Sequence, residues 1–592
     1  MRYLFHLNKY FLKYKWHVLL GILFVSLSNY FRILQPQAIR KALNEVTDLI
    51  SQHGQSHLLG NTELMSALSK SLLQFSALIL LYAIIMGIFM YAMRQSLVVM
   101  SRLIEYDMRK ELYQHFQSLD AEFYLTHRTG DLMSRISEDV AKVRMYLGPG
   151  ILYFINLLSL FIWVLYAMLS VSPILTIYTL LPLPILSVSI YFVSAIINRK
   201  SEKIQAQLGG LTAMVQESFS GINVIKSYVR EDSFKNYFKT ESNRYLDLSL
   251  DLAKVNALFF PLILLLIGVS NLITIYVGGN MMLEGSISAG NLVEFVIYIN
   301  MLTWPFTAVG WIASIIQQAA ASQKRILEIL HTQPKIKNSC TDKSIIQGGI
   351  SFKEVSFTYP SSGVKALKNI NINISPGQKI ALIGETGSGK SAFIELLLRI
   401  YDTTEGQIEL DGQEIKKMNL YDLREQISYV PQDVFLFSDT IQNNISFGKP
   451  DTQFEEIVKA AKMANILDEI ESLPDKFDTI VGERGVSLSG GQKQRISIAR
   501  ALIKKPKMLI FDDALSAVDP TTQAQIFSSL SSDQSKMKAT LIVSTHNITL
   551  IHDFDQIIVL DQGEIIELGS PQEIYAQKGY YYEVYNEQMS RM

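Results

Sequence analysis

Long apolar runs fill the first half of the chain and are rare in the second half. A helix that crosses a membrane needs about 20 mostly apolar residues. Six segments meet that length, at 16–38, 72–97, 148–170, 173–197, 255–279 and 290–316. We therefore expect six membrane-spanning helices, followed by a part whose shorter strand and helix patterns are typical of an α/β domain.

The segments between these spans are alternately short and long. Turns near 172–173 and 284–286 separate the third span from the fourth and the fifth from the sixth. The connectors at 98–147 and 198–254 are long, amphipathic and rich in Lys and Arg. Because basic residues accumulate in cytoplasmic loops, we expect both connectors and both chain termini to face the cytoplasm. The helical pattern predicts that the connectors extend the spanning helices into water.

Each long connector must reverse direction near its middle. Residues 120–124 lead into 128–132 in the first connector, and 217–221 lead into 225–228 in the second. An exposed aromatic side chain at such a tip can dock into another domain, whereas a plain helical hairpin gives the same spacing. The residues alone leave both interpretations open.

Polar residues also occur before the first apolar run and within the runs. Residues 1–16 mix aromatic with basic side chains and lack a signal-peptide cleavage site, which favours a helix on the membrane surface or a plain extension of the first span. Polar residues within the spans are candidates for solute contact. They are Asn29, Arg32, Arg94 and Asn271, and we assign none of them a role.

Length, charge and cysteine content bear on the domain organisation and on the classes of partner. A chain of 592 residues exceeds one hydrophobic core, so we expect a membrane domain at 1–330, a polar linker at 331–346 and a second domain at 347–592. The net charge of −1 gives no bulk attraction for nucleic acid. The single cysteine, Cys340, cannot form an internal disulfide, as suits soluble parts in a reducing cytoplasm.

A phosphate-binding pattern opens the second domain. The apolar run 379–383 predicts a buried strand, and an apolar helix pattern begins at Phe393. Between them lie Gly384, Glu385, Thr386, Gly387, Ser388, Gly389, Lys390 and Ser391. Glycines let successive N–H groups point at phosphates, Lys390 can reach the β- and γ-phosphates, and the Ser391 hydroxyl can ligate Mg²⁺. We therefore expect this domain to bind ATP with Mg²⁺.

A second acidic element follows later in the chain. The apolar residues 508–511 run into Asp512 and Asp513, which predicts a central strand with a carboxylate at its end. Downstream of a phosphate loop, Asp512 is placed to hold Mg²⁺ through water. This is the pattern called Walker B.

The pentapeptide at 488–492 resembles the signature sequence of ABC ATPases. Its residues are Leu488, Ser489, Gly490, Gly491 and Gln492. Other positions resemble further family elements and occur in the family order. They are Tyr359 (the adenine-stacking aromatic), Gln432 (the Q-loop), 482–485 (the exporter X-loop), 516–519 (the D-loop) and His546 (the switch histidine).

With its six spans and long connectors, the whole chain resembles a half-transporter of the type IV ABC exporters, the multidrug and lipid exporter family. The resemblance implies an all-α six-helix transmembrane domain followed by an α/β P-loop nucleotide-binding domain. It implies an ATPase that exports an amphipathic or lipid-like solute by alternating access across a bacterial plasma membrane. The connector tips would be coupling helices, and the partners would be membrane lipid, the solute and a second half-transporter, with no nucleic acid.

The same resemblance implies roles for the site residues. Ser391, Gln432 and Asp512 would hold Mg²⁺, while Asp513, Gln432 and His546 would serve in hydrolysis. Residues 488–492 would contact ATP bound to the partner chain, so that two ATP molecules lie at the dimer interface.

Two positions depart from the family pattern. Asp513 stands where most active members have glutamate, and Ala392 stands where threonine is usual. Aspartate is one methylene shorter, and misplacing a base by about 1 Å can slow catalysis about a hundredfold. The chain thus resembles the degenerate-site subunit of heterodimeric exporters, whose partner carries the glutamate. A homodimer in which Asp513 is a slow base is the alternative, and an ATP-gated regulator or channel is a weaker one.

Overall fold

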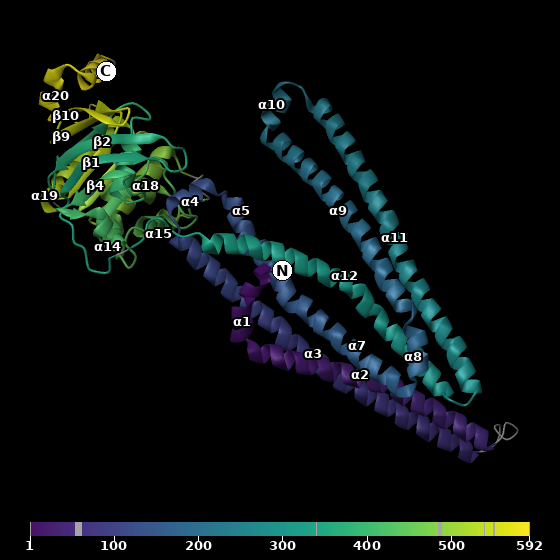
Figure 1. The fold of residues 1–592 in the computed structure, drawn as a ribbon. Helices are drawn as coiled ribbons and strands as arrows, with labels where there is room; N and C mark the ends of the chain where they lie inside the picture. The colour runs from purple at the N-terminus through teal and green to yellow at the C-terminus, as the bar shows by residue number, and fades with distance from the viewer. Residues whose placement is uncertain are drawn as a thin grey trace. The chain divides into compact units, whose positions relative to one another are not determined.

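The computed structural model divides into two compact units. One comprises Met1–Gln117 and Thr129–Thr332, and the other comprises Ser118–Arg128 and Gln333–Met592. The residues that the structure describes are 2–53, 62–338, 340–482, 488–537, 539–548 and 551–590. The first unit is helical and the second is α/β, as the sequence predicts (Figure 1).

The described part of the first unit consists of helices, several of them very long. They are η1 (Arg2–Leu7), α1 (Asn8–Lys13), α2 (Lys15–His53), α3 (Thr62–Ser118), α5 (Thr129–Ser134), η3 (Arg135–Asp139), α6 (Val140–Met145), η4 (Tyr146–Gly150), α7 (Ile151–Val171), α8 (Pro173–Leu180), α9 (Pro182–Ser220), α10 (Ile222–Ser227), α11 (Glu231–Leu283) and α12 (Ala289–His331). With 57 residues, α3 is about 85 Å long, whereas the bilayer core is about 30 Å thick. The prediction that connectors prolong the spans as helices is confirmed for α3, α9 and α11.

Five described segments, rather than the predicted six, are long and apolar enough to span a membrane on their own. They are Lys15–Leu49, Leu68–Ser118, Thr129–Val171, Glu231–Leu283 and Ala289–His331. The predicted fourth span, 173–197, is not one continuous helix, because α8 ends at Leu180 and α9 begins at Pro182. Proline has no N–H to donate, so the helical hydrogen-bond ladder is interrupted there.

The N-terminal segment packs on the long helix α3. The Lys9 ammonium and the Tyr10 hydroxyl both donate to Glu111, each at 2.6 Å. One helical turn from this contact in both helices, the Lys13 ammonium donates to Asp107 at 2.6 Å. These contacts hold the N-terminal segment against α3.

Helices α2 and α12 approach closely near the start of α12. Arg40 Nη1 lies 3.1 Å from the fully buried Glu294 carboxylate, whose other oxygen accepts from the Tyr298 hydroxyl at 2.7 Å. The N–H of Gly290 donates to Asn44 at 3.1 Å. A Cβ at position 290 would lie 2.6 Å from the Arg40 carbonyl oxygen, so this approach requires glycine.

The buried Asp139 joins the other half of α12 to the first connector. One of its oxygens accepts from the Ser322 hydroxyl at 2.7 Å and also from the Arg325 guanidinium. Arg135 Nη1 donates back to the Arg325 carbonyl at 2.7 Å, and its Nε donates to Asp131 at 2.8 Å. Charge-assisted bonds thus fix α12 to the connector shortly before the chain enters the second unit.

Two sheets form the core of the second unit. The first has the order β2-β1-β4-β5 and the second has the order β10-β9-β3-β8-β7-β6. The strands are β1 (Ile350–Thr358), β2 (Lys365–Ile374), β3 (Lys379–Ile383), β4 (Glu405–Leu410), β5 (Gln413–Glu414), β6 (Ile427–Val430), β7 (Met508–Asp512), β8 (Thr540–Ser544), β9 (Gln556–Asp561) and β10 (Glu564–Gly569). Strands β3, β7 and β8 pair in parallel and are buried almost throughout, which explains their continuous apolar runs.

Helices surround these sheets and place the candidate site. They are α4 (Ala121–Thr126), α13 (Lys390–Leu397), η5 (Ile415–Lys417), α14 (Leu420–Gln426), α15 (Ile441–Ser446), α16 (Phe454–Met463), α17 (Leu467–Ser472), η6 (Lys476–Asp478), α18 (Gly490–Leu502), α19 (Pro520–Met537), α20 (Pro571–Gln577) and α21 (Tyr580–Ser590). The carboxyl ends of β3, β7 and β8 meet at one edge of the second sheet, where ligands bind in open α/β folds.

The tip of the first connector, α4, belongs to the second unit. The Asp120 carboxylate accepts from the backbone N–H groups of Lys335 at 2.7 Å and Ile336 at 3.3 Å. The Lys335 ammonium lies 2.6 Å from Glu122, and the Phe123 side chain is buried. The tip therefore packs with the segment that leads into the second unit, and this contact favours the docking interpretation over a plain hairpin.

Replacement of Asp139 by leucine should destabilise the first unit by about 2 kcal/mol, because Ser322 and Arg325 lose a charged acceptor. All four tryptophans (Trp16, Trp163, Trp304 and Trp311) lie in this unit. Tryptophan fluorescence during thermal unfolding of the purified full chain therefore reports on it selectively.

The matched control is Glu138→Ala, which removes an exposed carboxylate from the neighbouring position. This control should leave the midpoint of the fluorescence transition unchanged. Equal midpoints for Asp139→Leu and Glu138→Ala would contradict the assigned role of Asp139.

Candidate functional site

The predicted phosphate loop connects the end of β3 to the start of α13. Gly384, Gly387 and Gly389 have φ angles of +147°, +85° and +109°, which favour glycine. A Cβ on Gly384 would also overlap the carbonyl oxygen of Leu560. The glycines therefore let the loop fold tightly over the sheet edge.

The Lys390 side chain lies across its own loop. Its ammonium donates to the carbonyl oxygens of Gly384 and Glu385, both at 2.8 Å. Burial lowers the pKa of this ammonium, and the charges of Asp513 and Asp512 oppose that effect. The buried Ser388 hydroxyl has no hydrogen-bond partner within the described residues, so the loop retains polar groups that can bind a ligand.

A cleft of about 520 Å³ opens over this loop, a size typical of small-molecule sites. It brings together most of the predicted site residues from distant parts of the chain. Those that line it are Tyr359, Thr386, Gly387, Gly389, Lys390, Ser391, Ala392, Gln432, Asp512, Asp513 and His546. Gly384, Glu385 and Ser388 belong to the loop but do not line the cleft.

Asp512 ends strand β7 beside the start of α13. Its side chain is buried and accepts from the Tyr429 hydroxyl at 3.4 Å. Burial raises the pKa of Asp512, and hydrogen bonding with Ser391 and the charge of Lys390 oppose the rise. A carboxylate next to a serine hydroxyl supplies the hard oxygen ligands that Mg²⁺ prefers, so these two residues fit the ion.

Asp513 has an unusual backbone conformation. Its φ angle is +46°, in the left-handed region, where aspartate is more common than most other residues. Its N–H donates to the Ser544 carbonyl at 3.0 Å, and its carboxylate accepts from Gln432 Nε2 at 3.4 Å. Burial raises the pKa of Asp513, while His546 lowers it. The aspartate, the glutamine and the histidine therefore face one part of the cleft.

Tyr359 is held by contacts on several sides. Its hydroxyl donates to Glu395 at 2.7 Å. The rings of Phe357 and Tyr401 lie edge-on to it, with centroids 4.9 and 5.6 Å away. The ring thus has a fixed position on the wall of the cleft.

The structure adds cleft residues that sequence reasoning missed. Lys365 and Lys368 come from β2, Ser544 ends β8, and Gln562 lies in the turn after β9. No short pattern marks these positions, because the sheet order alone brings them to the phosphate loop. The pair of lysines three positions apart was the one feature of the sequence that could have suggested a binding role for these residues.

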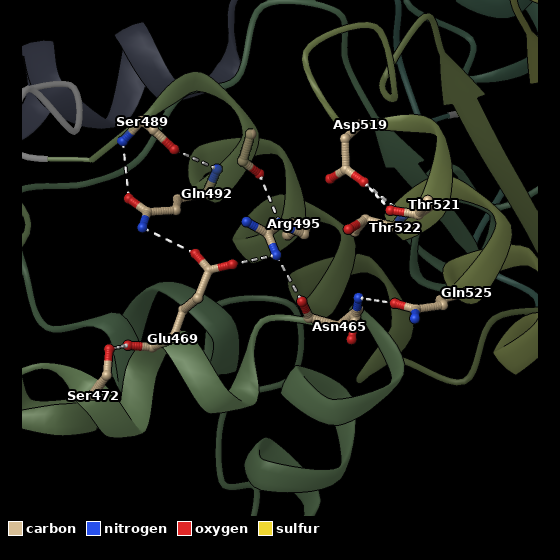
Figure 2. Close-up of polar contacts among 11 residues, drawn as sticks. Asn465, Glu469, Ser472, Ser489, Gln492, Arg495, Asp519, Thr521, Thr522 and Gln525 are labelled. Atoms are coloured by element: carbon tan, nitrogen blue, oxygen red, sulfur yellow. Dashed lines mark hydrogen bonds and ion pairs between the residues drawn. The ribbon is translucent and has the colours of Figure 1, made fainter.

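The signature residues lie at the start of helix α18, where polar contacts with α17 hold them (Figure 2). The Ser489 hydroxyl accepts from the Gln492 N–H at 3.2 Å, and the Gln492 side chain accepts from the Ser489 N–H at 2.9 Å, which is a capping box. Gln492 Nε2 then donates to Glu469 at 3.0 Å, and Arg495 lies 2.7 Å from the same carboxylate. Helix α17 therefore fixes the start of α18.

The signature is partly exposed at the start of α18. Leu488 is half-buried, whereas Ser489 and Gly490 are exposed. In the part of the chain that the structure describes, no signature residue lines the cleft around Lys390. Glu483, Arg484 and Gly485 of the predicted X-loop lie outside the described residues.

The predicted D-loop follows β7 directly. The Ser516 hydroxyl donates to the Asp513 carbonyl at 2.9 Å, and the Ala517 N–H donates to Gln494 at 3.1 Å. Hydrogen bonds from Thr521 and Thr522 lower the pKa of Asp519 (Figure 2). The D-loop thus links the acidic end of β7 to the signature helix.

Two family models match the chain. One describes the ABC transporter transmembrane region and matches residues 18–306, and the other describes the ABC transporter and matches residues 367–516.

Similar proteins match over most of their length. The Multidrug resistance-like ATP-binding protein MdlA of Escherichia coli K12 is 35% identical over 87% of this chain and 88% of its own. The Probable multidrug resistance ABC transporter ATP-binding/permease protein YheI of Bacillus subtilis 168 is 37% identical over 82% of this chain and 83% of its own.

A solved structure of a bacterial Atm1-family ABC exporter with ATP bound is similar across both units. It is 25% identical, with a TM-score of 0.77, and the match covers 97% of this chain and 99% of that one. The chain therefore belongs to the ABC transporter family, as an exporter half-transporter with a membrane domain and an ATPase domain on one polypeptide.

Proposed function

We propose that this chain is one half of a dimeric exporter that moves an amphipathic or lipid-like solute out of a bacterial cell by alternating access. The observation that carries the proposal is one cleft that unites a phosphate loop, an acidic strand end and a histidine, on the same polypeptide as helices long enough to span a membrane. Residues 1–330 form the membrane domain, 331–346 the linker and 347–592 the ATPase domain. Both termini face the cytoplasm, and the family relatives named for multidrug resistance support this class of solute.

Different residues of the cleft bind different parts of ATP. The backbone N–H groups of 384–391 surround the phosphates, and Lys390 leaves the carbonyls of its own loop to contact the β- and γ-phosphates. Tyr359 supports the adenine ring. Ser391, Gln432 and Asp512 hold Mg²⁺, which neutralises phosphate charge when it is bound.

Two features indicate that the site is completed by a second chain. Ser489 and Gly490 of the signature are exposed, and none of the signature residues, all of which the structure describes, lines the cleft over the chain's own phosphate loop. The tip of the second connector, around α10, exposes apolar side chains that suit a protein surface: Phe219, Val224, Tyr228 and Val229 are 62–82% exposed. We therefore assign the signature to ATP bound by a partner half-transporter, and the α10 tip to the partner's ATPase domain.

The short side chain of Asp513 favours a heterodimer, in which the partner chain differs in sequence. Asp513 is placed to be the base that activates water, with Gln432 and His546 beside it, but its side chain is about 1.5 Å shorter than that of glutamate. Ala392 stands where threonine is usual, so a hydroxyl near the phosphates is also missing. In a heterodimer this chain would form the slow site, and its intact signature would complete the fast site of a glutamate-bearing partner.

Asp513→Glu should raise the ATPase rate of the purified chain alone in lipid by about a hundredfold, since a carboxylate in reach of the water restores general-base catalysis. The wild type alone should be nearly inactive. Lys390→Ala in the Asp513→Glu chain is the control, and it should abolish the gain. A wild-type chain that hydrolyses ATP briskly as a stable dimer would contradict the heterodimer and make the chain a homodimeric exporter.

Asp120→Ala should weaken the transmission of ATP binding to the membrane domain, because Lys335 and Ile336 lose the acceptor that holds the α4 tip. All tryptophans lie in the first unit, so the change in their fluorescence on adding MgATP reports this transmission. We expect its amplitude to fall severalfold while the affinity for ATP is unchanged. Glu138→Gln is the control, and equal amplitudes for both variants would contradict a coupling role for α4.

A further inference from the structure

The last helix of the described chain, α21, contacts the loop that carries His546. The side-chain amide of Gln588 makes two hydrogen bonds of opposite polarity with this loop. Its Nε2 donates to the His546 carbonyl at 2.7 Å, and its Oε1 accepts from the Ile548 N–H at 2.9 Å. One amide therefore fixes the backbone on both sides of Asn547.

Helix α21 is itself firmly anchored. The Glu567 carboxylate, on β10, accepts from the N–H groups of Tyr580 and Tyr581 at the start of the helix. The Tyr581 side chain is 2% exposed and packs in the core of the second unit, with Tyr585 partly buried against it. Gln588 follows these residues at helical spacings of seven and three, so it lies on the same buried face. Its position is thus set by the helix.

The opposite side of the loop is held by the sheet. The Thr545 N–H donates to the Leu382 carbonyl at 3.2 Å, and the Thr545 hydroxyl accepts from the Asn547 N–H at 3.0 Å. His546 therefore lies between a point fixed by β3 and a point fixed by α21, and its side chain lines the cleft. Movement of α21 would shift the backbone that carries the imidazole.

We propose that Gln588 is a positioning residue for His546, so that the C-terminal helix sets the geometry of the switch histidine in the nucleotide cleft. The inference rests on the proposed ATPase function and on the proposed role of His546 in it. Gln588 is not among the residues that line the cleft, so it acts through the loop. Loss of its two bonds should reduce turnover without reducing the binding of ATP, because the phosphate loop and Tyr359 are not attached to α21.

The test uses the full chain in lipid, in whichever of the wild-type and Asp513→Glu forms hydrolyses ATP faster. Gln588→Leu removes both bonds at similar volume, and Gln588→Glu keeps only the acceptor for Ile548. Both should lower kcat about tenfold, with KM for ATP within about twofold. Asn586→Ala removes an exposed amide from the same helix and should change neither constant.

A double-mutant cycle separates positioning from general stability. Added to His546→Ala, Gln588→Leu should cause less than about a twofold further loss, because the residue it positions is already absent. Losses that multiply, or a Gln588→Leu chain that behaves like Asn586→Ala, would overturn the proposal.

Hydrogen exchange gives a readout that does not depend on hydrolysis. The Ile548 amide should exchange about tenfold faster in Gln588→Leu than in Asn586→Ala, because its acceptor is lost. If neither form of the chain hydrolyses ATP, the proposed function fails. Unchanged exchange at Ile548 would instead overturn the contact on which this inference depends.

Discussion

Parallel pairing of β3, β8 and β7 is the constraint on which the nucleotide site depends. In this pairing, Ser544 of β8 lies opposite both Leu382 of β3 and Asp512 of β7. The three strands consequently end at one edge, and the segments that follow them emerge side by side. The phosphate loop, the acidic end of β7 and the histidine loop meet for this reason, although they are far apart in the sequence. Burial of both sheet faces in turn demands the continuous apolar runs of these strands.

The same fold leaves two groups of residues facing outward. Ser489 caps the start of α18, and the Glu469 carboxylate holds Gln492 in place. The signature nevertheless does not line the cleft of its own chain. The α4 tip is fixed by the Asp120 carboxylate on the backbone of Lys335 and Ile336, whereas the α10 tip exposes its apolar residues. These two surfaces, the start of α18 and the α10 tip, are the ones for which we propose contact with another half-transporter.

Sequence reasoning succeeded where local pattern carries the structure. The phosphate loop needs glycines at defined positions, and β7 needs an apolar run, so both were visible as strings of residues. The sequence does not reveal positions that only long-range contacts bring to the site. Lys365 and Gln562 reach the cleft through the order of the strands, and Gln588 reaches His546 through the packing of Tyr581. The break at Pro182 was legible in the sequence, but proline in a membrane span does not always end a helix.

The backbone at Asp513 bears on why this chain carries aspartate there. A φ of +46° is tolerated by aspartate better than by most residues with a Cβ, so the backbone itself suits the shorter acid. Glutamate at the same position would adopt a less favoured backbone conformation in exchange for a carboxylate about 1.5 Å further into the cleft. The Asp513 N–H is bonded to the Ser544 carbonyl, so the main chain cannot move forward to supply that reach. With β7 and β8 fixed by their pairing, the reach of the carboxylate into the cleft depends on the side chain rather than on the main chain, and this is why the proposed slow site turns on one methylene.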